Sequence, residues 1–194
     1  MHRPRLWKGA WALLVLALTA CVDLSAWLGP DTRLREPDVV YDPTPAEVVE
    51  AMLDLAQLQP GDVLYDLGSG DGRIVIAAAQ RPGVRAIGID IDAELVARAR
   101  DNAEHAGVGA RAEFRVGDLF AAEIGDASVV TLFLGAELNL RLRPRLLEVL
   151  APGTRIVSHQ YDMGRWLPDG ERRVGNRILY RWTVPLGASS IRQE

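Results

Sequence analysis

The stretch "VLYDLGSGDGRIVIAAAQ", Val63–Gln80, decides the fold of this 194-residue chain. Its apolar beginning, Val63 to Asp66, predicts a short buried strand that ends in an acid. Glycines follow at alternate positions, and the small apolar residues after them predict a helix over Arg73–Arg81. A strand, a glycine turn and a helix form the first unit of a parallel sheet, in which glycine lets the backbone approach a ligand closely.

Strand and helix signals alternate along the rest of the domain. Thr44 is the expected N-cap of a helix that has Pro45 at its first position and ends at Pro60-Gly61. Further strands are predicted at 85–90, 112–116, 129–134 and 154–159, and helices at 93–106 and at 138–150, the latter interrupted near Pro144. A turn at Gly175-Asn176 predicts a final antiparallel hairpin. The expected fold is α/β: a Rossmann-like seven-stranded sheet, mostly parallel, with helices on both faces.

The amino end predicts a separate segment, so we expect a leader at 1–22, a linker at 23–42 and the folded domain at 43–194. Basic residues precede an apolar run, Gly9–Val22, that is shorter than a spanning helix requires. It ends in Leu18-Thr19-Ala20-Cys21, which resembles the bacterial lipobox, and Cys21 is the only cysteine. The alternative is an uncleaved anchor. Both interpretations predict a membrane-associated bacterial protein and leave the side of the membrane open.

Composition limits the classes of partner. The formal net charge of −4 lacks the basic excess of proteins that bind phosphate backbones, so no nucleic acid is expected. The arginines that concentrate late in the chain are interpreted mainly as solvated surface. No cysteine and histidine cluster indicates a metal site.

Three acids are expected to meet at one edge of the sheet. Asp66, Asp90 and Asp118 each lie at the carboxyl end of a predicted strand, where parallel sheets bind ligands. A nicotinamide dinucleotide would require G-x-G-x-x-G, and its pyrophosphate would be repelled by Asp66 and by Asp71 inside the glycine loop. The carboxylates instead suit a ligand with a cationic amino group.

The segments "DLGSGDGR", "GID" and "GDLF" resemble the class I S-adenosylmethionine-dependent methyltransferases. The resemblance implies S-adenosyl-L-methionine as cofactor, with the glycine loop around its methionine part, Asp90 on the ribose and Asp118 at the adenine. The cofactor-binding residues that it implies are Asp66, Gly68, Ser69, Gly70, Asp90, Ile91, Asp118 and Leu119.

A narrower resemblance covers nearly the whole domain. The segments "PTPAEVVEAML", "GDVLYDLGSGDGRIVIAAA" and "ELNLRLRPRLLEVLAPGTRIVSHQYDMGRW" are similar to a prokaryotic group related to the membrane-anchored lysine methyltransferases of the ATP synthase c-subunit and the adenine nucleotide translocase. This resemblance implies N-methylation of lysine in a protein substrate, and membrane proteins are among the candidate substrates.

The residues around the acceptor are less well defined. Methyltransferases that act on adenine or glutamine amides often carry Asn/Asp-Pro-Pro-Tyr/Phe after the fourth strand, where this chain has "FLGAELN". Glu137 and Asn139 follow that strand and are the first candidates to position the acceptor, although helix capping and first-turn charge explain them equally well. Further residues are candidates to face the acceptor, or in the case of Tyr41 to cover the cofactor, and a structural role is the alternative for each: His159, Tyr161, Asp162, Trp166, Trp182 and Tyr41.

Two other functions remain open at this stage. A small-molecule methyltransferase would use the same cofactor residues. A membrane-anchored binding module could keep the fold without catalysis, because a lipobox would place the domain outside the cytoplasm, where the cofactor is made. The oligomeric state is not predicted.

Overall fold

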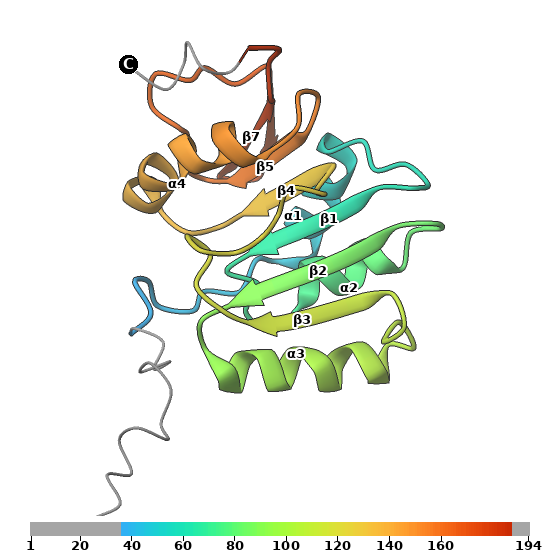
Figure 1. The fold of residues 1–194 in the computed structure, drawn as a ribbon. Coiled ribbons are helices and arrows are strands. Elements are labelled where there is room, and N and C mark those ends of the chain that lie inside the picture. The colour runs from blue at the N-terminus through green and yellow to red at the C-terminus, as the bar shows by residue number, and fades with distance from the viewer. Residues whose placement is uncertain (1–35, 188–194) are drawn as a thin grey trace, which may run out of the picture. The chain divides into compact units, whose positions relative to one another are not determined.

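The computed structural model describes residues 36–187, which form a single sheet with helices packed against it (Figure 1). The helices are α1 (Ala46–Leu55), α2 (Arg73–Ala79), α3 (Ala93–His105) and α4 (Ala136–Val149). The strands are β1 (Val63–Leu67), β2 (Arg85–Asp90), β3 (Ala112–Val116), β4 (Val129–Leu132), β5 (Arg155–His159), β6 (Gly170–Val174) and β7 (Arg177–Thr183).

The sheet has seven strands in the order β3-β2-β1-β4-β5-β7-β6, which confirms the predicted fold class. The first five strands are parallel, and β7 inserts antiparallel between β5 and β6. Successive strands run outward from β1 to β3, and the chain then returns to place β4 on the other side of β1. This reversal opens a crevice at the carboxyl ends of β1 and β4, the usual ligand position in such sheets.

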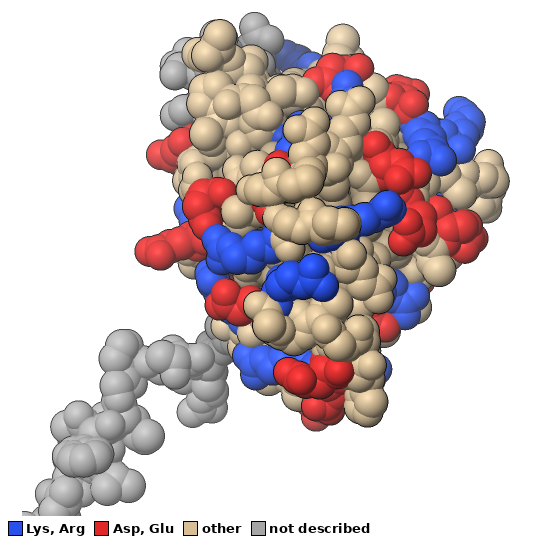
Figure 2. Space-filling view, turned by 90° about the vertical axis from the view of Figure 1, so that its right-hand side faces the viewer, with Lys and Arg blue, Asp and Glu red and all other residues tan. Residues whose placement is uncertain are grey.

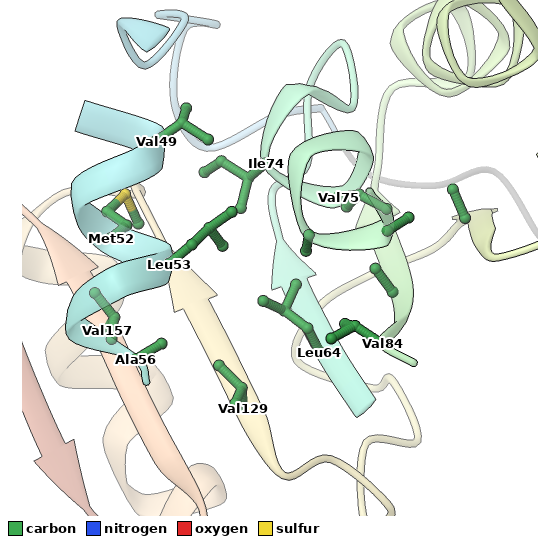
Figure 3. Packing of buried hydrophobic residues seen from close by; sticks show 14 of the residues in the cluster. Val49, Met52, Leu53, Ala56, Leu64, Ile74, Val75, Val84, Val129 and Val157 are labelled. Atoms are coloured by element: carbon green, nitrogen blue, oxygen red, sulfur yellow. The ribbon is translucent and has the colours of Figure 1, made fainter. Parts of the chain in front are cut away.

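Each face of the sheet is covered by its own hydrophobic core. The first core joins α1, α2 and α3 to the sheet; Figure 3 shows Leu53 of α1 and Ile74 of α2 directed toward each other, with Leu64 of β1 in the same cluster. The second core joins α4 to the side chains that alternate with these, such as Tyr65 and Leu67 of β1. Because side chains alternate along a strand, a central strand buried on both faces is apolar at successive positions, as Val63–Tyr65 of β1 are, before Asp66 near its end.

The start of α1 differs from the prediction that Thr44 caps it. The helix begins at Ala46 after Pro45 and has no side-chain cap. The Thr44 hydroxyl lies 3.3 Å from Nδ1 of His159, so a tertiary contact with β5 takes the group that local sequence assigned to the helix.

The predicted interruption of α4 is also wrong, because the helix continues through Pro144. Proline removes the N–H that would bond the carbonyl of Leu140, four residues earlier. Leu140 is 44% exposed and Pro144 is also exposed, so the proline lies on the solvent side of α4.

The predicted leader and the lipobox around Cys21 lie outside the described residues. Within residues 36–187, every helix is too short or too polar to cross a bilayer.

Candidate functional site

A cavity of about 370 Å³ opens at the carboxyl ends of the strands. Its floor is the glycine loop after β1, and its sides come from the ends of β2 and β4 and the loop after β3. All the cofactor-binding residues implied by the sequence line this cavity: Asp66, Gly68, Ser69, Gly70, Asp90, Ile91, Asp118 and Leu119. The sheet therefore brings together residues that are up to 53 positions apart, from 66 to 119.

Asp66 is the most electrostatically strained group of the cavity. Burial raises the pKa of its carboxyl, and the carboxylates of Asp90 and Asp71 add to this, whereas the Thr131 hydroxyl opposes it by donating a 2.7 Å hydrogen bond; the resulting pKa is about 7. Removing water from a carboxylate disfavours its charged form, and two like charges nearby add to that cost. A cationic ligand group in the cavity would offset both effects.

Asp90 shapes the glycine loop as well as lining the cavity. One carboxylate oxygen accepts a 2.7 Å hydrogen bond from the Gly70 N–H, and the other accepts a 3.0 Å bond from the Asp92 N–H. Asp118 holds the loop after β3 in the same way, by accepting a 2.9 Å bond from the Phe120 N–H. Each carboxylate is thus fixed in direction by backbone donors before a ligand arrives.

Gly68 and Gly70 are required by the space that their backbone leaves. Both have positive φ, at 80° and 53°. A Cβ at Gly68 would lie 2.5 Å from the Leu134 side chain, and one at Gly70 would lie 2.6 Å from the ring of Tyr41. The loop therefore lies tightly between the end of β4 and the segment that precedes α1.

That preceding segment, residues 37–44, forms a further wall of the cavity and is called the strap here. Figure 1 shows the chain before α1 lying at the arrowhead ends of the central strands. Asp38 at its start lies 3.6 Å from Arg141 of α4, and the Thr44 carbonyl at its end accepts a 2.9 Å bond from Arg73. The sequence suggested a covering role for Tyr41 alone, because the strap has no periodic pattern that would mark it as ordered.

Asp71, the extra acid of the glycine loop, is already paired. Burial raises the pKa of its carboxyl, but the Arg73 guanidinium, which donates bonds of 2.9 and 2.6 Å to its two oxygens, lowers the pKa more, and the net shift is downward. Asp71 therefore anchors the start of α2, and its charge is largely neutralised.

The two first candidates for acceptor positioning are placed differently. Glu137 is exposed in the first turn of α4 and lines a smaller hollow beside the main cavity, together with Asp38 and Arg141. Asn139 is fully buried, and its amide donates to the Ser158 hydroxyl at 2.9 Å and to the Tyr161 carbonyl at 3.0 Å. The structure therefore gives Asn139 a role in holding the loop after β5.

The later aromatic candidates divide into two groups. Trp166 and Trp182 pack against each other in the second core, with the Trp182 indole N–H donating to the Trp166 carbonyl, so core packing is confirmed for both. His159 and Tyr161 instead lie beside Phe133, a cavity-lining residue that the sequence reading missed. Its position directly after β4 was the available signal.

No group of His, Cys, Asp and Glu side chains within the described part of the chain is arranged to hold a metal ion.

Comparison with known proteins gives a consistent family. A family profile described as the ANTKMT methyltransferase domain matches residues 66–170. A protein-lysine N-methyltransferase of Saccharolobus islandicus is 44% identical over 133 residues, which are 68% of this chain and 83% of that protein. The mouse lysine N-methyltransferase of the ATP synthase c-subunit is 34% identical over 80% of this chain, and the match spans 61% of the mouse protein.

Solved structures agree on the methyltransferase fold and on the cofactor class, and one of them is named for a different acceptor. A crystal structure of an RNA methyltransferase from Salinibacter ruber, in complex with S-adenosyl-L-homocysteine, is 56% identical and has a TM-score of 0.73, covering 74% of this chain and 94% of that one. A methyltransferase from Geobacter sulfurreducens with the same ligand is 26% identical, with a TM-score of 0.55 over 71% of this chain and 53% of that one.

The buried charge of Asp66 leads to a prediction for Asp66→Asn. Folding raises the pKa of the Asp66 carboxyl. The contribution of this group to folding stability is therefore fully present below its unfolded pKa of about 4, and it is lost as the pH rises to about 7. The asparagine variant lacks this loss, so the unliganded variant should be more stable than the wild type at pH 8, by up to about 4 kcal/mol. Urea unfolding at pH 5 and pH 8 measures the difference.

The matched control is Glu171→Gln on β6, where an exposed carboxylate is neutralised and little change is expected. If Asp66→Asn is less stable than the wild type at pH 8, the account of Asp66 as a buried, strained charge is wrong.

Proposed function

The chain belongs to the ANTKMT methyltransferase family, and from that premise we propose that it methylates lysine side chains of a protein substrate. The protein is an S-adenosylmethionine-dependent methyltransferase. One observation carries the lysine assignment. A protein-lysine N-methyltransferase is 44% identical to this chain, and the match spans 83% of that protein's length.

The cavity fits S-adenosylmethionine by its chemistry. The cofactor has a cationic amino group, a sulfonium, two ribose hydroxyls and an adenine amine, all of which favour acceptor or anionic groups. The cavity supplies Asp66, Asp90 and Asp118, and the glycines let the loop backbone lie close against Leu134 and Tyr41 at the cavity wall. The lining residues therefore match the cationic and donor groups of the cofactor in charge.

The residues of the chain act mainly by alignment. When bound, S-adenosylmethionine supplies a methyl group that passes from its sulfonium to the lone pair of the acceptor nitrogen. Asp90 and Asp118 would hold the nucleoside part, and Asp66 with the glycine loop would hold the methionine part. The strap forms one wall of the cavity. Holding two reactants in line accounts for a large part of such a rate acceleration.

Among the described residues, the side of the domain away from the cavity lacks the continuous basic patch of a nucleic-acid-binding surface (Figure 2). Several arginines are paired with acids, as in Arg81 with Glu50 at 2.6 Å and Arg85 with Asp126 at 2.7 Å. Figure 2 views the side of the domain away from the strand ends that line the cavity, and shows basic and acidic side chains interspersed. Proteins that bind a phosphate backbone instead gather their cations into continuous patches.

Labelling tests the acceptor class directly. Full-length protein carrying Lys8→Arg is incubated with methyl-labelled S-adenosylmethionine and a bacterial membrane extract. Lys8 is the only lysine in the sequence, so this variant cannot label its own lysine. We expect protease-sensitive label that is recovered as methyl-lysine after acid hydrolysis, and no label with Asp66→Asn in the same background.

Other outcomes identify other acceptors. Label removed by ribonuclease would contradict the lysine proposal and support an RNA substrate, as named for the Salinibacter protein. Label found only in low-mass products would support a small-molecule methyltransferase, and absence of label from a folded, cofactor-binding protein would favour a binding module.

We also propose that the amino-terminal segment attaches the enzyme to the membrane with its domain on the cytoplasmic side. The apolar run of Gly9–Val22 supports attachment, and the need for S-adenosylmethionine, which is made inside the cell, supports the cytoplasmic side. The lipobox resemblance at Cys21 is the observation that opposes this orientation.

A reporter that is active only in the cytoplasm, fused after Glu194, tests the orientation. We expect activity in intact cells and recovery of the fusion in the membrane fraction. A membrane-bound but inactive reporter, with an export-dependent reporter active in its place, would put the domain outside the cytoplasm.

A further inference from the structure

The strand order shows which end of the cavity faces the acceptor. Asp118 follows β3, Asp90 ends β2, and Asp66 with the glycine loop belongs to β1. A cofactor that lies along these strand ends has its nucleoside toward β3 and its methionine part at β1. The next positions along the same edge are the ends of β4 and β5. The acceptor is therefore expected beside the residues that follow these two strands.

Aromatic rings occupy those positions. Phe133 follows β4 directly and lines the cavity beside Leu134, and Tyr161 follows β5. Their ring centroids are 6.2 Å apart, with the planes inclined by 19°. Both side chains are partly exposed. Phe133 lines the cavity itself, and the Tyr161 ring, which is not among the lining residues, stacks beside it and extends the aromatic surface outward from the cavity wall.

His159 packs against the ring of Phe133 and holds it in place. The two ring centroids are 3.9 Å apart, and the imidazole is fully buried. Arg177 donates to Nε2 at 3.1 Å, which leaves Nδ1 to carry the proton that bonds the Thr44 hydroxyl. Burial, followed by the Arg177 charge, lowers the pKa of His159 to about 4, so the imidazole is neutral at physiological pH and adds no positive charge beside Phe133.

The backbone that carries Tyr161 is also fixed. The buried Asn139 amide donates to the Tyr161 carbonyl, and Gln160 takes up a positive φ of 72° while its N–H donates to the Ile178 carbonyl at 2.7 Å. A non-glycine residue in this conformation is uncommon and marks a loop held by its surroundings. The two rings are thus presented by a rigid frame.

We propose that Phe133 and Tyr161 form the binding surface for the side chain of the acceptor lysine. This inference rests on the proposed lysine methylation and adds the residues that contact the acceptor. The methylene chain of lysine packs on aromatic surface, and its amine, when protonated or methylated, is attracted by ring electron density. Because His159 is neutral, Arg177 is the one positive charge of the His159–Arg177 pair, and the imidazole that contacts Phe133 adds no second charge to repel that cation.

Binding of a cationic probe tests this surface without catalysis. The full-length Lys8→Arg protein is saturated with S-adenosylhomocysteine and titrated with Nα-acetyl-Nε-trimethyl-lysine methylamide. The same titration uses the neutral isostere, in which carbon replaces the quaternary nitrogen. We expect the wild-type surface to bind the cation about tenfold more tightly than the isostere.

The variants separate ring chemistry from folding. Phe133→Leu and Tyr161→Leu should each reduce the preference for the cation to about twofold or less, whereas Tyr161→Phe, which keeps the ring, should retain it. Tyr180→Leu is the matched control, because it removes a partly buried ring from β7, which contributes no residue to the cavity. A thermal melt of each variant confirms that it is folded, and if Phe133→Leu is not, Tyr161→Leu decides.

The proposal is overturned if the wild type binds both probes equally, if it binds neither at the highest soluble concentration, or if the preference survives in the folded leucine variants. The lysine assignment fails separately, when the labelling experiment recovers no methyl-lysine. Methyl-lysine recovered together with equal binding of the two probes would retain the proposed function and remove only Phe133 and Tyr161 from the acceptor site.

Discussion

The site depends on one electrostatic constraint, which is that three carboxylates must share a crevice that is partly closed to water. The burial of Asp66 and its repulsion by Asp90 and Asp71 oppose the unliganded state, and both raise the pKa of Asp66. The sheet imposes this arrangement, because Asp66, Asp90 and Asp118 end or follow adjacent parallel strands. The unliganded domain is therefore less stable than it would be without these charges, and a bound cationic ligand would restore that stability. Such a local cost is common at functional sites.

The rest of the domain supports that edge. Two cores hold the central strands in register, and backbone N–H groups fix the carboxylates of Asp90 and Asp118. The strap closes one side of the cavity through contacts with α4 and Arg73. On the far side of the glycine loop, Phe133 continues the cavity wall toward β5. A cofactor and an acceptor can thus meet at the boundary between β1 and β4.

Local sequence predicted the features that local physics controls. The run before Asp66 is apolar because β1 is buried on both faces, and the positions of Asp90 and Asp118 followed from strand ends alone. Thr44 could not be assigned correctly, because its partner His159 lies 115 residues away. The continuous α4 depended on the exposure of the turn around Pro144, and the role of Phe133 depended on contacts with β5. Neither is encoded in a periodic pattern.

Calorimetric titration of S-adenosylmethionine into the wild type and Asp90→Ala tests the central claim most directly, namely that the strand-end acids build the cofactor site. Asp90 offers charge-assisted acceptors and orders the glycine loop, so its loss should weaken binding by about 1–3 kcal/mol. Circular dichroism establishes that the variant is folded. Equal affinity of the two folded proteins would contradict the account, because the cofactor would then be held without the edge on which the site is built.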